Sequence, residues 1–128
     1  MLVSAQLRQE MLAHVLSCLP EEACGLLGGL DGQAGCVQAV ENELHSPVRF
    51  RMRAQDQLGA FLALEEAGLE LVGIFHSHPT GPAVPSSTDL AEFYYPGVLV
   101  LIWSPLGGAW QLRAFRIEAG QAVEVQLL

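Results

Sequence analysis

Two histidines, one residue apart, stand at the end of an apolar run and could bind a metal ion together. His76 and His78 close the run 69–75, which is typical of a buried strand, and residues i and i+2 of a strand point to the same face. Pro79 cannot continue the sheet, so the chain enters a loop that can bring Asp89 back towards the imidazoles. Two neutral nitrogens and one carboxylate suit zinc, and three protein ligands leave a fourth position open for chemistry.

The four residues 86–89 also have the form of a helix start. Ser86 is a typical N-cap, and an acidic residue three positions later completes a capping box. Capping alone would explain both Ser86 and Asp89, but it does not explain why paired histidines stand just upstream. The combination therefore favours a metal site with Asp89 as a ligand.

Length and composition limit the class of protein. The chain has 128 residues and 51% apolar content, which predicts one domain over residues 1–128 with a single core. Six basic and fourteen acidic residues give a net charge of −8, which repels phosphate backbones. The N-terminus does not resemble a signal peptide, and the longest apolar run, 98–103, is far shorter than the ~20 residues of a membrane span. We therefore expect a cytoplasmic protein that binds neither nucleic acid nor membranes.

The three cysteines and the other two histidines are not predicted to bind a metal. Cys18, Cys24 and Cys36 are odd in number and form no C-x-x-C pair, so we expect reduced thiols and no thiolate zinc site. His14 is expected on the surface of an amphipathic helix, and His45 has no partner at metal-ligand spacing.

Hydrophobic periodicity predicts helices interspersed with strands. Helices are expected over 4–17 with Ser4 as N-cap, over 54–67 with Gly68 just past the end, and over 87–93. Strands are predicted over 21–29, 36–42, 69–75, 98–103, 110–117 and 122–127, the first two forming a hairpin. This order predicts an α/β (α+β) domain with a mixed sheet flanked by helices.

A row of arginines offers a second candidate binding feature. Arg49, Arg51 and Arg53 alternate with apolar residues, so an extended segment would place three guanidinium groups on one face. Such a row can receive a carboxylate or a phosphate. A solvated strand face is the commoner explanation and the one we favour, with substrate contact as the alternative.

The candidate metal-binding and catalytic residues together resemble the signature of the JAMM/MPN metalloprotease family. That signature is an upstream glutamate, then His-Ser/Thr-His-Pro, then seven residues between the second histidine and a serine, and an aspartate three positions beyond it. His78, Ser86 and Asp89 match this spacing without departure. The Glu-x-x-Gly spacing before the first strand selects Glu22, rather than its neighbour Glu21, as the upstream glutamate.

The resemblance implies a fold, a cofactor and an activity. The fold would be a mixed sheet in a cytidine-deaminase-like layout, with one zinc ion per chain held by His76, His78 and Asp89. Glu22 would transfer the proton between the attacking water and the departing amine, and Ser86 would donate a hydrogen bond to the oxyanion. The short length resembles compact bacterial members, which implies hydrolysis of the amide bond after the C-terminal Gly-Gly of a ubiquitin-like sulfur-carrier protein or its conjugate.

Other functions remain as alternatives. A catalytically silent MPN-type interaction module would typically lack the ligands that this sequence keeps. A zinc nucleobase deaminase needs His-x-Glu and Pro-Cys-x-x-Cys, which do not occur. A RadC-like protein shares part of the motif, but its link to DNA does not fit the net charge of −8. The sequence leaves open the substrate and leaving group, zinc against another divalent metal, and a monomer against a homodimer.

Overall fold

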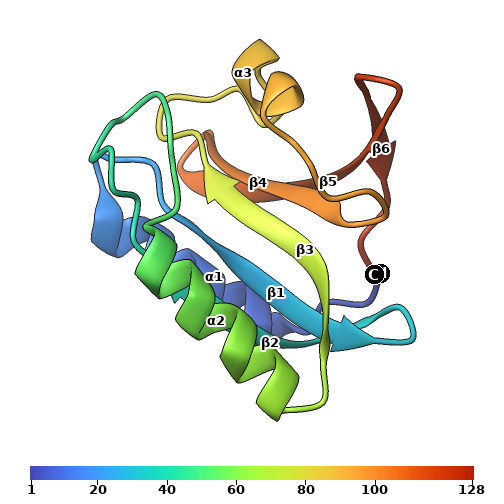
Figure 1. Cartoon of the computed structure of the whole chain (residues 1–128). Helices are drawn as coiled ribbons and strands as arrows, with labels where there is room; N and C mark the ends of the chain where they lie inside the picture. The colour runs from blue at the N-terminus through green and yellow to red at the C-terminus, as the bar shows by residue number, and fades with distance from the viewer.

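The computed structural model describes residues 1–128, which form three helices and six strands (Figure 1). The helices are α1 (Ala5–Cys18), α2 (Ala54–Glu66) and α3 (Ser87–Ala91). The strands are β1 (Cys24–Leu30), β2 (Gln33–Val40), β3 (Glu70–Ser77), β4 (Leu99–Leu106), β5 (Ala109–Glu118) and β6 (Gln121–Val125). This confirms the predicted mixture of helices and strands.

The six strands form one mixed sheet in the order β2-β1-β3-β4-β5-β6. Only β3 and β4 run parallel, and every other neighbouring pair is antiparallel. Strand β3 therefore lies in the middle, where His76 pairs with Cys24 of β1 on one side and with Ile102 of β4 on the other. Because both edges of β3 are hydrogen-bonded, the position of its C-terminal end is well fixed.

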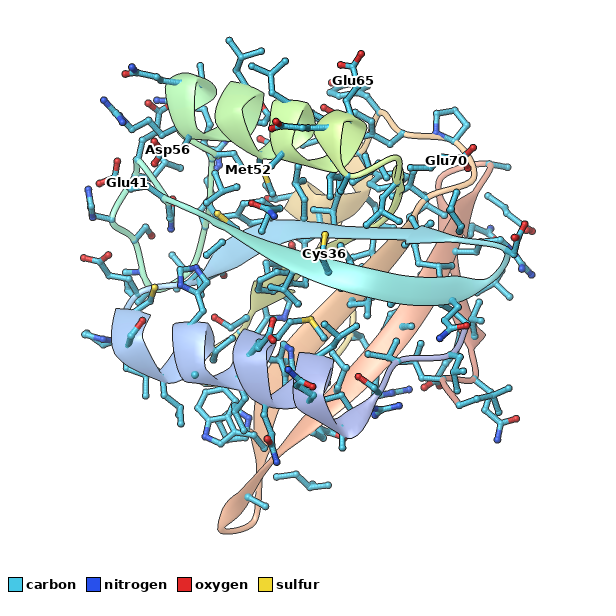
Figure 2. The ribbon with its side chains drawn as sticks, turned by 90° about the horizontal axis from the view of Figure 1, so that it is seen from below. Cys36, Glu41, Met52, Asp56, Glu65 and Glu70 are labelled. Atoms are coloured by element: carbon cyan, nitrogen blue, oxygen red, sulfur yellow. The ribbon has the colours of Figure 1, made fainter.

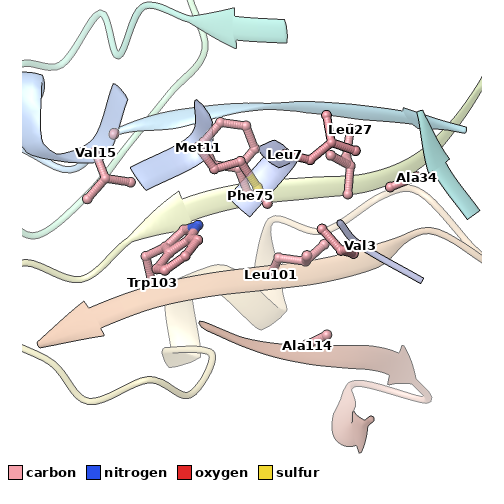
Figure 3. Close-up of a cluster of buried hydrophobic side chains, with 11 residues drawn as sticks. Val3, Leu7, Met11, Val15, Leu27, Ala34, Phe75, Leu101, Trp103 and Ala114 are labelled. Atoms are coloured by element: carbon pink, nitrogen blue, oxygen red, sulfur yellow. The ribbon is translucent and has the colours of Figure 1, made fainter. Parts of the chain in front are cut away.

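The two long helices cover opposite faces of the sheet, as the view from below shows (Figure 2). Alternate residues of β3 contribute to the two cores, as the period of a strand requires. Phe75 belongs to the core under α1, with Met11, Val15, Leu101 and Trp103 (Figure 3). Ile74 belongs to the core under α2, with Cys24, Leu26, Val40 and Leu64. His76 lies two residues after Ile74, so it projects from the face that α2 covers.

A glycine allows the two central strands to pack closely. A Cβ atom at Gly25 of β1 would lie 2.4 Å from the ring of Phe75, which pairs with it across the sheet. Real Cβ contacts are longer, so a larger residue would displace the ring from the core. The glycine of the Glu-x-x-Gly segment therefore has a packing role close to the candidate site.

Several predicted boundaries were wrong by a few residues. Strand β1 begins at Cys24 rather than at 21, and β2 spans Gln33–Val40 rather than 36–42. Helix α3 ends at Ala91 rather than at 93. The first shift matters because the backbone N–H of Glu22 donates to the carbonyl oxygen of Ser46 in a loop, not to a sheet partner. Glu22 thus lies in the approach to the strand.

His14 does not occupy the surface position that periodicity predicted. It is half-buried, and its Nε2 atom lies 3.0 Å from the carbonyl oxygen of Cys24. That contact connects α1 to the first residue of β1. The three cysteines are free thiols. The helices are all too short or too polar to span a membrane.

Candidate metal centre and catalytic site

Three side-chain atoms converge at the C-terminal end of β3. The Nε2 atoms of His76 and His78 lie 3.1 Å apart, and each lies 3.1 Å from Oδ2 of Asp89. Ligand atoms of a tetrahedral zinc ion, with metal distances of ~2.0–2.1 Å, are separated by roughly 3.3 Å. The observed spacing is close to this value, so the arrangement can hold a metal ion.

One hydrogen bond fixes the tautomer of His78, and burial favours the neutral form of His76. Nδ1 of His78 lies 2.7 Å from the carbonyl oxygen of Pro82, which can only accept, so Nδ1 carries the proton and Nε2 carries the lone pair. His76 is 2% exposed and stacks on Phe50 with ring centroids 4.6 Å apart. Burial lowers the pKa of His76 and favours its neutral form. Neutral imidazoles are the form that binds metals.

Helix α3 brings Asp89 to the imidazoles. The N–H of Ser86 donates to Oδ2 of Asp89 at 2.8 Å, and the N–H of Asp89 donates to Oγ of Ser86 at 3.0 Å. This is the predicted capping box. The same Oδ2 atom faces both imidazoles, so the two interpretations of Asp89 are compatible. The hydroxyl of Ser86 accepts this bond and is exposed, which leaves its own proton free to donate.

Glu22 is placed beside the imidazoles by contacts from three segments. Its N–H donates to Ser46, and its carbonyl oxygen accepts from Nδ2 of Asn42 at 3.0 Å. The next residue, Ala23, donates its N–H to Oγ of Ser77 on β3 at 2.8 Å. The Glu22 side chain is therefore buried, and its carboxylate and the two imidazoles each offer a ligand atom within 4.8 Å of the others.

The Glu22 carboxyl group has the properties of a proton-transfer group. Its Oε1 atom is buried and has no hydrogen-bond partner within the protein. Burial raises the pKa of Glu22 to about 7, with the positive charge of His78 opposing the rise and the negative charge of Asp89 adding to it. A carboxyl group with a pKa near neutrality can both accept and release a proton at physiological pH.

One residue that organises the site had no signal in the sequence. Asn42 is 6% exposed, and all four of its side-chain hydrogen bonds go to backbone groups. Its Nδ2 donates to the carbonyl oxygens of Glu22 and Arg49, and its Oδ1 accepts from the N–H groups of Leu44 and Arg51. Asn42 thus fixes both the glutamate and the following loop. Only the general tendency of asparagine to bond nearby backbone could have suggested it.

Replacing Asn42 by alanine is expected to lower the free energy of unfolding by about 2–4 kcal/mol, because one buried and three partly buried backbone groups lose their partner. Urea unfolding of the variant against the unchanged protein would measure this. Gln121→Ala, at an exposed position of β6, is the matched control and should change stability by less than about 0.5 kcal/mol. Equal unfolding midpoints for the two variants would contradict the role given to Asn42.

The three arginines do not form the shared face that their alternation suggested. Arg49 pairs with Glu92, Arg51 with Glu43, and Arg53 with both Asp56 and Glu41. The carboxylates of Asp56 and Glu41 lie close together near the start of α2 (Figure 2). The segment is a loop with one bridge, between Met52 and Asn42, so it lacks the regular alternation of a strand. Each guanidinium thus has at least one carboxylate partner, and His45 contacts Glu21 and also Glu41, which it shares with Arg53.

Two hollows flank the converging nitrogens. The aromatic hollow, of about 240 Å³, has His76 and Asp89 in its wall and is lined mainly by Phe50, Met52, Phe93, Tyr94 and Tyr95. The proline hollow, of about 180 Å³, has Glu22, His78 and Ser86 in its wall and is otherwise lined by Pro47, Val48, Thr80, Gly81, Pro82, Val84 and Pro85. A substrate bound across the site would therefore meet two chemically different surfaces.

Known proteins are similar to this chain in sequence and in fold. Residues 4–118 match the protein family described as "prokaryotic homologs of the JAB domain". A protein named desampylase from Pyrococcus furiosus is 38% identical over 103 residues, covering 79% of this chain and 74% of that protein. A protein named CysO-cysteine peptidase from Mycobacterium bovis is 32% identical over 127 residues, covering 97% and 87%. The solution structure of a Desulfitobacterium hafniense protein is 34% identical with a TM-score of 0.89, covering 99% and 90%.

The chain therefore belongs to the compact prokaryotic JAMM/MPN family that these JAB-domain homologs form. With named peptidases among relatives that align over most of its length, it is a JAMM-type peptidase. The alternative of a catalytically silent interaction module loses its support, since the family signature and the named activities agree.

Proposed function

We propose that this peptidase is zinc-dependent and hydrolyses the amide bond after the C-terminal Gly-Gly of a ubiquitin-like sulfur-carrier protein or its conjugate. The observation that carries the proposal is the convergence of two imidazole nitrogens and one carboxylate oxygen beside the buried Glu22. The names of the relatives, which include a desampylase, a CysO-cysteine peptidase and a probable TtuB-protein conjugate cleaving protease, support a carrier conjugate as substrate.

His76, His78 and Asp89 are the proposed metal ligands, and Glu22 the proposed proton-transfer residue. The Asp89 oxygen lies 3.1 Å from both nitrogens, whereas the Glu22 oxygen Oε1 makes no hydrogen bond. This difference favours Asp89 as the third ligand. When bound, zinc supplies a Lewis acid that activates water and polarises the scissile carbonyl. Glu22 would accept the proton of the attacking water and then release it to the departing amine.

Ser86 is proposed to donate a hydrogen bond to the oxygen that becomes negative during attack. Its hydroxyl accepts from Asp89, and its remaining proton is available on the exposed side of the site. Removal of one such donor typically costs about 3 kcal/mol of transition-state stabilisation. A tail of two glycines suits this environment, because a backbone without side chains can approach imidazoles that are almost fully buried.

The three free thiols support a location in the reducing cytoplasm.

The proposal is tested by measuring metal content and cleavage in the same protein samples. We expect elemental analysis to find one zinc ion per chain, and a His76→Ala/His78→Ala double variant prepared identically to contain none. Carriers extended beyond Gly-Gly should be cleaved by the zinc-loaded protein, left intact after chelation, and cleaved again once zinc is returned. Cleavage at an unchanged rate by the metal-free double variant would contradict the proposed site.

A further inference from the structure

The two imidazoles of the proposed metal site are oriented by different contacts. Nδ1 of His78 bonds to the carbonyl oxygen of Pro82, which holds that ring in place. His76 has no matching contact, because its side-chain hydrogen-bond contacts, to His78 and Asp89, all use Nε2. A histidine ligand usually donates its other ring N–H to an acceptor that fixes the ring. The orientation of the His76 ring therefore comes from another source.

The side chain of Phe50 supplies a contact that fixes the plane of the His76 ring. The two rings are stacked, with their centroids 4.6 Å apart and their planes at 28°. The His78 ring meets His76 at 63°, so it does not support the face of that imidazole. Because the lone pair of Nε2 lies in the plane of the imidazole, rotation of the His76 plane would turn the lone pair away from Asp89 and His78.

The backbone on both sides of Phe50 is held by one side chain. Nδ2 of Asn42 donates to the carbonyl oxygen of Arg49, and Oδ1 of Asn42 accepts from the N–H of Arg51, each at 3.1 Å. The N–H of Glu43 also donates to the carbonyl oxygen of Arg51 at 2.9 Å. Phe50 lies outside the helices and strands, but these bonds fix the backbone from which its ring projects. The phenyl ring is thus presented to the imidazole by a well-anchored segment.

We propose that Phe50 is a positioning residue of the metal site, which holds the His76 ring in the orientation that metal binding needs. The inference rests on the proposed function, since it takes His76 as a metal ligand. A phenyl ring offers no ligand atom, so Phe50 acts through the imidazole that it covers. An imidazole that is already aligned loses less rotational freedom when the ion binds, so the stack raises the affinity of the site for the ion.

The test compares two variants that lack the ring, Phe50→Leu and Phe50→Met, with Phe50→Tyr, which keeps it. The zinc affinity of each is measured by competition with a chelator at one pH. We expect both ring-free variants to bind zinc at least about tenfold more weakly than the unchanged protein, which is the usual effect of losing a contact that orients a ligand. Phe50→Tyr should stay within about threefold of the unchanged protein, because a tyrosine ring can form the same stack.

Phe61→Leu is the matched control for the loss of core packing. Phe61 is half-buried like Phe50 and packs against the same core under α2, but the ring beside it is that of Tyr95 and not an imidazole. Both leucine substitutions remove a ring from this core, and only Phe50→Leu should weaken zinc binding. Equal losses of zinc affinity in the two variants would overturn the inference, because they would show an effect of packing alone.

The metal-free protein gives a second measurement that does not involve the ion. A phenyl ring stacked on an imidazole shifts the NMR signals of the carbon-bound imidazole protons upfield. The His76 signals of the unchanged protein should show this shift and should return towards ordinary positions in Phe50→Leu. The His78 signals should move much less, because the ring of His78 does not stack on Phe50 and its Nδ1 keeps the contact with Pro82.

The outcomes separate this inference from the function on which it rests. Unchanged zinc affinity in the ring-free variants would overturn the positioning role of Phe50, even if the His76 signals move. Absence of the upfield shift from the unchanged protein would also overturn it. Failure of the unchanged protein to bind zinc would instead overturn the proposed function, while the NMR comparison would still report whether the two rings are stacked.

Discussion

Replacing Glu22 by glutamine is expected to lower kcat/KM for a Gly-Gly adduct by about 10³-fold, because an amide cannot accept and release the proton. The substitution keeps the size of the side chain and leaves His76, His78 and Asp89 in place. The variant should therefore bind as much metal as the unchanged protein. Steady-state kinetics and elemental analysis of the same sample measure both quantities.

The adjacent Glu21 provides a matched control for this variant. Its side chain is more than one-third exposed and contacts His45 rather than the proposed metal ligands. Glu21→Gln should therefore keep kcat/KM within about twofold, since an exposed pair of this kind contributes little. A Glu22→Gln protein as active as the unchanged enzyme would remove Glu22 from the mechanism. Equal losses in both variants would show that the effect is not specific to Glu22.

Replacing Asp89 is expected to remove the metal, and a pair of variants separates ligation from capping. Asp89→Ala removes both the carboxylate and the acceptor of the Ser86 N–H, which costs the α3 cap about 1 kcal/mol. Asp89→Asn keeps an oxygen that can accept this bond but loses the negative charge that favours a divalent ion. We expect both variants to lose most of their metal and most of their activity.

Metal titration followed by dialysis would distinguish the two roles of Asp89. If Asp89 were only a cap, Asp89→Asn would bind metal like the unchanged protein, and only Asp89→Ala would be weakened. Ser86→Ala supplies the opposite control, because it removes the hydroxyl that caps α3 and leaves the carboxylate. Full metal content in both Asp89 variants would exclude Asp89 as a ligand.

The parts of the site that were predictable are those encoded by short spacing. His76 and His78 were expected on one face because residues i and i+2 of a strand share a face, and the structure brings their Nε2 atoms to 3.1 Å. The helix start at Ser86 was expected from the capping signal, and that capping box is present. Periodicity also identified every helix and strand, with errors mainly at their ends.

The rest of the site depends on contacts between segments that are distant in the sequence. Only the resemblance to a known family, and no periodicity, pointed to Glu22, because its position is set by Asn42, Ser46 and the pairing of Ala23 with Ser77. The stacking of Phe50 on His76 and the separate pairing of the arginines have the same origin. Side-chain bonds across loops leave no repeating pattern for a sequence to display.

Helix α3 also links metal exchange to local stability. It has five residues, none of them buried, and an isolated helix of that length is unstable in water. Its position over the site therefore depends on its cap, on Asp89 and on the ion pair between Glu92 at its end and Arg49. With Asp89 as a ligand, opening of this one turn and release of the metal become a single event, while the central sheet stays folded. The residence time of the ion would then follow the opening rate of α3, so amide hydrogen exchange in this turn would slow whenever the ion is bound.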